Sequence, residues 1–144
     1  MARNETYIDV APHAVYALLG DAGAYGHWVV GSKTIRDSDE EWPAPGASFH
    51  HSVGAGPLVI RDRSTVVNSR PPVMLELIAH ARPLPSARVT LHLQPEGAGT
   101  RVTMIEDPSS RLLSILIGPL GHALVRLRNA ESLRRLKSLA EERY

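Results

Sequence analysis

The last third of the chain, Ile117 to Tyr144, carries the longest helical pattern in the sequence. Apolar residues recur there at Leu133, Leu136 and Ala140, which is the three- and four-residue spacing of one helix face. No other segment is long enough to cover the short, strand-like segments that come before it. The sequence therefore predicts a long C-terminal helix that packs against a sheet.

The two halves of this helix carry apolar stripes that do not share a face. Traced back toward the helix start, the face of Leu133 passes through Asn129, Arg126 and His122, whereas the first half has its own apolar stripe at Leu116, Leu120, Ala123, Leu124 and Leu127. A straight helix with one partner cannot bury both stripes. Either the first half packs on something else, or the helix bends near Gly121. We expect the second half to set the register, which directs His122, Arg126 and Asn129 inward.

The rest of the chain is rich in two-residue alternation, the period of half-buried strands. Thr6, Ile8 and Val10 form a first strand, and Pro12 and Gly20 bracket a short helix. A second short helix is expected at 22–27, further strands at 29–36, 47–53, 58–67, 73–81, 87–93 and 100–106, and a short helix at 111–117 before Pro119 opens the long one. Closely spaced strands that end at Gly or Pro predict an antiparallel meander rather than βαβ units.

Length and composition limit the number of domains and the classes of function. At 144 residues, with no linker or repeat, we expect one domain spanning residues 1–144. The absence of cysteine excludes thiol catalysis and Cys-based zinc sites, and 16 Lys and Arg against 15 Asp and Glu give no argument for nucleic acid. The apolar run Leu112 to Val125 is too short for a membrane span of about 20 residues. We expect a soluble cytoplasmic protein without stable membrane insertion.

Strand, two short helices, six strands and a long helix follow one another in the helix-grip order. The chain resembles the SRPBCC superfamily (START-like proteins), in its polyketide cyclase/dehydrase and lipid-transport branch. The resemblance rests on segments in this order and spacing: Ile8 to Leu19, Tyr25 to Trp28, Pro71 to Leu75, Gly99 to Thr103, and Arg128-Asn129 followed by Leu133 and Leu136. It implies an α+β helix-grip fold of about seven strands, in which a curved antiparallel sheet wraps around the C-terminal helix and encloses a cavity.

Alternate residues of a strand point to the same face of the sheet. Within the implied fold, the alternate set that is mainly apolar in each strand is expected to face the cavity. The apolar candidates for ligand binding are Phe49, Leu75, Leu77, Leu91 and Met104. The polar candidates are His51, Asp62, Glu106, His122, Arg126 and Asn129. An apolar concavity with a few fixed polar groups is typical of a small-molecule site.

Each polar candidate has a plainer interpretation. Glu106 either faces the cavity or reaches solvent at its strand end, and Arg126 either recognises a ligand or pairs with Glu106 as a structural ion pair. His122 serves as a general base if it is buried near a carboxylate, and is otherwise a solvated helix residue. The histidines show no metal-ligand spacing, so we expect neither a metal site nor a cofactor.

Three functions remain. The first is binding of a small hydrophobic molecule: a lipid, an aromatic metabolite or a polyketide-like compound. The second is an aromatase/cyclase-type enzyme that uses Glu106, His122 and Arg126 as acid, base and polarising cation. The third is a non-catalytic interaction domain that forms a homodimer through the stripe Leu120, Leu124 and Leu127.

Overall fold

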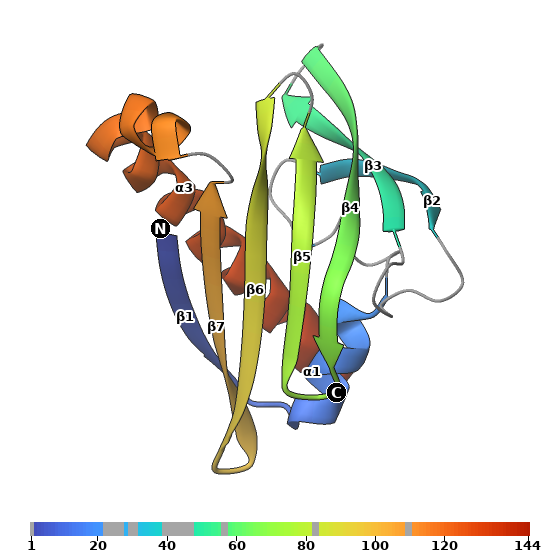
Figure 1. Ribbon diagram of the computed structural model, residues 1–144. Helices are drawn as coiled ribbons and strands as arrows, with labels where there is room; N and C mark the ends of the chain where they lie inside the picture. Colours follow the sequence, from blue (N-terminus) through green and yellow to red (C-terminus); the bar gives the residue numbers. More distant parts are fainter. Residues whose placement is uncertain are drawn as a thin grey trace.

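A computed structural model describes residues 2–21, 28, 32–38, 48–55, 58–81, 84–108 and 111–144, with side chains for 2–21, 28, 64–79, 86–108, 115 and 118–144. The second short helix predicted at 22–27 lies outside the described residues. The elements are β1 (Ala2–Ile8), α1 (Pro12–Leu19), β2 (Ser32–Ser38), β3 (Ser48–Ala55), β4 (Leu58–Arg70), β5 (Met74–Ala81), β6 (Leu84–Glu96), β7 (Gly99–Pro108) and α3 (Arg111–Arg143). The numbering of the helices follows Figure 1.

The described strands form one antiparallel sheet in the order β1-β7-β6-β5-β4-β3-β2, with α1 and α3 on one face (Figure 1). Strands β2 to β7 are a meander, and β1 joins its β7 edge, with Ile8 opposite Thr100 and Ala2 opposite Glu106. The helix α3 follows β7 and lies mainly along β1. The predicted α+β architecture, an antiparallel sheet packed against a long C-terminal helix, is confirmed.

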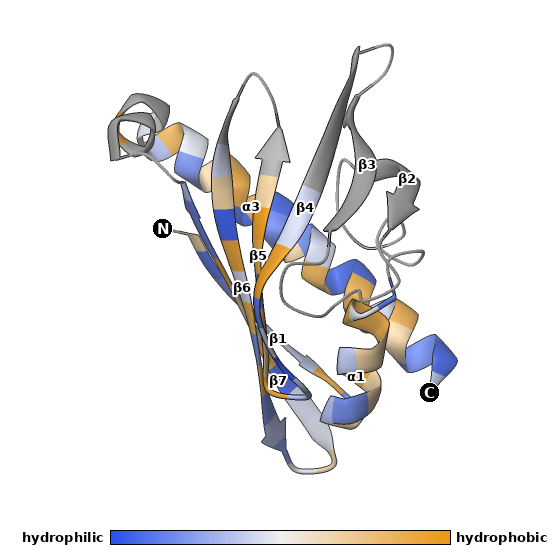
Figure 2. Ribbon diagram, turned by 45° about the vertical axis from the view of Figure 1, so that its right-hand side comes forward, coloured by the Kyte–Doolittle hydropathy of each residue, from blue (hydrophilic) through white to orange (hydrophobic). Residues whose placement is uncertain are grey.

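Strand register keeps one set of residues on the helix-covered face. Met104 lies opposite Asn4 on one side and Leu91 on the other, and Leu91 lies opposite Leu75. The side chains of this inner layer are buried, as Val66, Leu75, Leu77, Leu91, Leu93, Val102 and Met104 show. Hydrophobic colouring concentrates on the same strands in Figure 2. Burial of this layer is the main apolar stabilisation that the sheet offers the helices.

Several strands extend beyond their predicted ends, among them β4 and β6. Strand β4 continues to Arg70 through an irregularity between Val66 and Asn68, where the sequence pattern breaks. Strand β6 takes in Pro85 and Pro95, which lie outside the predicted strand at 87–93. Proline is tolerated near strand ends because its missing N–H costs least there, so the predicted strand is shorter than β6 at both ends.

The helix α3 is interrupted at Gly118, whose φ of 67° and ψ of −175° are not helical. This backbone conformation is available almost only to glycine. Pro119 follows, and proline suits the first position of a helix because its missing N–H has no partner there. The predicted short helix before Gly118 and long helix from Pro119 are confirmed. The bend near Gly121, one of the two alternatives for the long helix, does not occur, since Gly118 is the one described residue of α3 with a non-helical backbone.

The second half of α3 sets the register of the helix, as we expected. Leu133, Leu136 and Ala140 are buried in the core, and Asn129 is fully buried on the same face. The stripe of the first half points away, with Leu120, Leu124 and Leu127 exposed by 74%, 59% and 68%. These residues lie on the opposite side of the helix, so burying one stripe exposes the other.

Two buried interactions join the end of β1 to the start of β7. The hydroxyl of Thr100 donates a hydrogen bond to the carbonyl of Val10 at 2.7 Å. Next to it, a Cβ on Gly99 would collide with the Tyr7 side chain and with the backbone carbonyl of Ile8. Gly99 and Thr100 therefore allow the two strands to approach each other closely at this end.

We expect Thr100→Val to lower the free energy of unfolding by about 1–3 kcal/mol, because it leaves the buried Val10 carbonyl without its donor. Urea denaturation followed by circular dichroism measures this change. Thr103→Val is the matched control, because Thr103 lies on the same strand but on the opposite face. Equal stability of both variants and the wild type would contradict the role given to Thr100.

Two glycine substitutions in α3 should change stability in opposite directions. Gly118→Ala should destabilise by about 1–3 kcal/mol, because alanine is strained in this conformation. Gly121→Ala should stabilise by about 0.5–1 kcal/mol, because Gly121 lies within the helix. Thermal unfolding of both variants checks the position of the break, and the reverse order of stabilities would place it at Gly121.

Candidate functional site

Polar side chains meet on the inner face where α3 crosses β1 and β7. Arg128 bridges two of them, donating from Nη2 to Glu106 Oε1 at 2.5 Å and to Asn129 Oδ1 at 3.3 Å. Asn4 on β1 donates from Nδ2 to the backbone carbonyl of Arg126 at 3.0 Å. We call Asn4, Glu106, Arg128 and Asn129 the inner polar cluster.

Two amide atoms of the inner polar cluster are unsatisfied. Asn129 Nδ2, a donor, and Asn4 Oδ1, an acceptor, are closed off from solvent and have no hydrogen-bond partner among the described residues. Buried polar atoms in native proteins are nearly always paired, and each exception calls for an explanation. A buried amide with an unpaired N–H beside an apolar layer is suited to bind an acceptor atom.

The ion pair predicted for Glu106 forms with a different arginine. Arg128 is its partner, with side chains 45% exposed for Arg128 and 11% for Glu106. The Arg126 side chain is exposed, and only its backbone carbonyl joins the cluster. At 3.6 residues per turn, Arg126 lies about 60° around the helix from Asn129. Val125 lies on the other side of Asn129 around the helix, and its side chain is half-buried. The buried face of α3 therefore includes Val125 and leaves Arg126 outside.

Of the other candidates on α3 and the sheet, Asn129 is fully buried, as expected for an inward-facing residue. His122 is half-buried, two helical turns before Asn129. Four apolar candidates are buried in the inner layer: Leu75, Leu77, Leu91 and Met104. None of these positions by itself tests a ligand-binding role, which stays a prediction.

The remaining three candidates lie on β3 and β4. The backbone register sets His51 opposite Asp62 and Phe49 opposite Ser64, and Ser64 is fully buried. The side chains of Phe49, His51 and Asp62 lie outside those that the structure describes. Their adjacency in the register agrees with the strand parity on which they were selected.

Several polar residues of the inner side were missed from the sequence. Asn4 continues the inward parity of Thr6 and Ile8, and this was the signal that could have found it. Tyr16 on α1 lies 2.5 Å, hydroxyl to hydroxyl, from Ser69 on β4. Burial raises the pKa of the Tyr16 phenol, and the hydrogen bond to Ser69 opposes this shift. This contact depends on tertiary packing alone, because the two residues are far apart in the chain.

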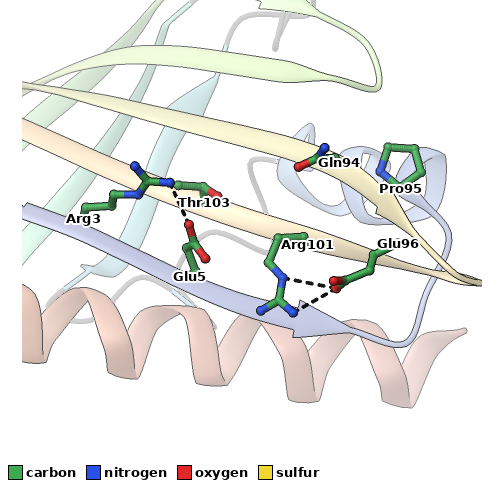
Figure 3. A pocket seen from close by; sticks show the side chains of 7 residues that line it. All are labelled: Arg3, Glu5, Gln94, Pro95, Glu96, Arg101 and Thr103. Carbon is green, nitrogen blue, oxygen red and sulfur yellow. Dashed lines mark hydrogen bonds and ion pairs between the residues drawn. The ribbon is translucent and has the colours of Figure 1, made fainter.

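A separate depression of about 320 Å³ lies on the outer face of the sheet, lined by Arg3, Glu5, Gln94, Pro95, Glu96, Arg101 and Thr103 (Figure 3). Two ion pairs occupy it: Arg3 with Glu5 at 2.8 Å, and Arg101 with Glu96 at 2.9 Å. Because its charges are exposed and already compensated, this surface is unsuited to a hydrophobic molecule.

Among the residues described, no group of three His, Asp or Glu side chains is arranged to hold a metal ion. In the same part of the chain, no helix combines the length and apolarity that spanning a bilayer requires.

Solved structures share the whole fold at low sequence identity. TTHA0849 from Thermus thermophilus superposes with a TM-score of 0.75 at 18% identity, covering 98% of this chain and 97% of its own. The di-domain ARO/CYC StfQ from the steffimycin biosynthetic pathway gives 0.73 at 17% identity, covering 98% of this chain and 50% of its own. Ara h 8.0201 gives 0.72 at 10% identity, covering 97% and 96%.

These likenesses establish the fold, and no curated protein matches the chain. A family assignment comes from the sequence pattern described as "Polyketide cyclase / dehydrase and lipid transport", which matches residues 2–141. Since that match covers nearly all of the described strands and helices, the chain belongs to the polyketide cyclase/dehydrase and lipid transport family of the SRPBCC superfamily.

Proposed function

We propose that the protein binds a small hydrophobic molecule between the inner face of the sheet and α3. The family, whose description includes lipid transport, supports this class of ligand. The observation that carries the proposal is the fully buried Asn129, whose Nδ2 lacks a partner among the described residues. It lies on the helix face that packs against an apolar layer.

The two unsatisfied amide atoms suggest which polar group the ligand carries. Leaving a buried N–H unpaired costs about 1–3 kcal/mol, which a ligand acceptor would recover. Asn4 Oδ1 calls for a donor in the same way. A hydroxyl or a hydroxy-carbonyl group would supply both, while Leu75, Leu91 and Met104 would contact the apolar body.

Access to these atoms requires a movement. Asn129 Nδ2 and Asn4 Oδ1 are both closed off from solvent. Arg128 is the bonded neighbour of Asn129 whose side chain is 45% exposed, so it is the group that can most easily swing away. Rearrangement of Arg128 would open the inner polar cluster from its edge while the apolar layer stays packed.

The ligand's polar group is tested with a matched pair of fluorescent probes, anthracenemethanol and methylanthracene. Asn129→Leu should weaken binding of the alcohol roughly tenfold, the equivalent of one hydrogen bond, and leave the hydrocarbon unchanged. Its free energy of unfolding should fall by no more than about 1 kcal/mol, because the substitution removes an unpaired donor together with the 3.3 Å hydrogen bond from the half-exposed Arg128. An unchanged affinity for the alcohol would overturn the role of Asn129.

The space for the ligand is tested at Ala79, a half-buried small residue opposite Ser64. Ala79→Leu should reduce the affinity for methylanthracene roughly tenfold by filling the inner layer. Ile78→Leu, on the same strand and the opposite face, is the control. Equal binding by both variants would argue against a site between sheet and helix.

An aromatase/cyclase-type enzyme is the second candidate, favoured by the short Glu106–Arg128 pair beside Asn129. StfQ, which has this fold, is described as an ARO/CYC protein. Glu106 would take a proton from the methylene between two carbonyls of a poly-β-keto chain, and Arg128 would hold the enolate oxygen that forms.

The enzyme candidate predicts that Glu106→Gln lowers product formation by roughly 100-fold or more, the usual contribution of a general base. The assay supplies the chain from a minimal polyketide synthase and measures cyclised product by mass spectrometry. Glu96→Gln, on the outer face, is the control. Unchanged product with Glu106→Gln would leave binding without turnover.

A further inference from the structure

The first half of α3 exposes a row of large apolar side chains. Leu120, Leu124 and Leu127 lie on the face turned away from the core, and Ile115, before the break at Gly118, is exposed by 75%. Figure 1 shows this end of α3 extending past the neighbouring ends of β1 and β7. We call Ile115, Leu120, Leu124 and Leu127 the outer stripe. Leu120, Leu124 and Leu127 share one face of the helix, and an exposed apolar row of this kind is a candidate interaction site.

The segment around the outer stripe has a one-sided charge. No Asp or Glu occurs between Asp107 and Glu131, whereas Arg111, Arg126 and Arg128 are present with His122. The Arg126 side chain is exposed, and Arg128 is paired with Glu106. An apolar stripe flanked by cations and free of carboxylates matches a surface that offers both hydrocarbon and phosphate.

A second copy of the chain fits this segment less well. Four side chains offer on the order of 400 Å², about half of the roughly 800 Å² that each partner buries in a stable interface. A two-fold contact would also bring the cationic segments of both copies together without carboxylates to pair with them. An anionic bilayer surface accepts the apolar side chains and attracts the guanidinium groups at once.

We propose that the first half of α3 is a membrane-docking surface, in which the outer stripe enters the headgroup boundary of an anionic bilayer and Arg126 contacts lipid phosphate. Ile115 and Leu120 lie on either side of the break at Gly118, in the short and the long segment of α3. This inference is independent of the proposed ligand site, because it uses the opposite face of α3. It concerns reversible surface binding and not a membrane span.

The full chain is tested by flotation with vesicles of equal amounts of phosphatidylglycerol and phosphatidylcholine, and with vesicles of phosphatidylcholine alone. We expect binding to the anionic vesicles that weakens as salt is raised. The double variant Leu120→Ser, Leu124→Ser should bind roughly tenfold more weakly or worse. Val67→Ser, Val73→Ser is the matched control, because these two exposed residues lie on and beside β4.

Arg126→Glu should weaken binding to the anionic vesicles by a factor of roughly five. Circular dichroism melts confirm that each variant is folded, which exposed substitutions allow. Absence of binding by the wild type, or equal binding by the stripe and control variants, would overturn the proposal. A dimer in light scattering that Leu124→Ser dissociates would also overturn it and assign the outer stripe to a second copy.

Discussion

The packing of Leu133, Leu136 and Ala140 against the inner face of the sheet is the interaction on which the rest of the structure depends. It fixes the rotation of α3 about its axis, since these three side chains can be buried in one orientation only. That orientation carries Asn129 into the core and turns Leu120, Leu124 and Leu127 outward. One apolar contact thus determines both the candidate ligand site and the exposed stripe.

The pairing of β1 with β7 brings the polar groups of the site together. Because the first strand lies beside the last one, Asn4 and Glu106 reach the same region of α3 although they are far apart in the sequence. Thr100 and Gly99 secure the end of this pairing where the strands approach each other closely. The unsatisfied amides then lie beside a mainly apolar layer, where a ligand's polar group would gain most from pairing with them.

Sequence periodicity predicted the apolar residues of the inner layer but not which arginine joins the inner polar cluster. Strand parity selected Leu75, Leu91 and Met104 because a two-residue period survives in any antiparallel sheet. Helical periodicity could not separate Arg126 from Val125, since both lie near the edge of the same face. It also gave no reason to choose Arg128 as the partner of Glu106, because side-chain reach across a strand–helix contact depends on the crossing geometry.

The sequence by itself determined the architecture, because alternation, helical period and the Gly118-Pro119 pair are local signals that tertiary contacts did not reverse. It also determined that both stripes of α3 could not be buried together. Only the tertiary structure decided which stripe is buried, which arginine pairs with Glu106, and that Asn4 joins Asn129. These outcomes depend on the distance and rotation between α3 and the β1–β7 edge, and no local pattern encodes that geometry.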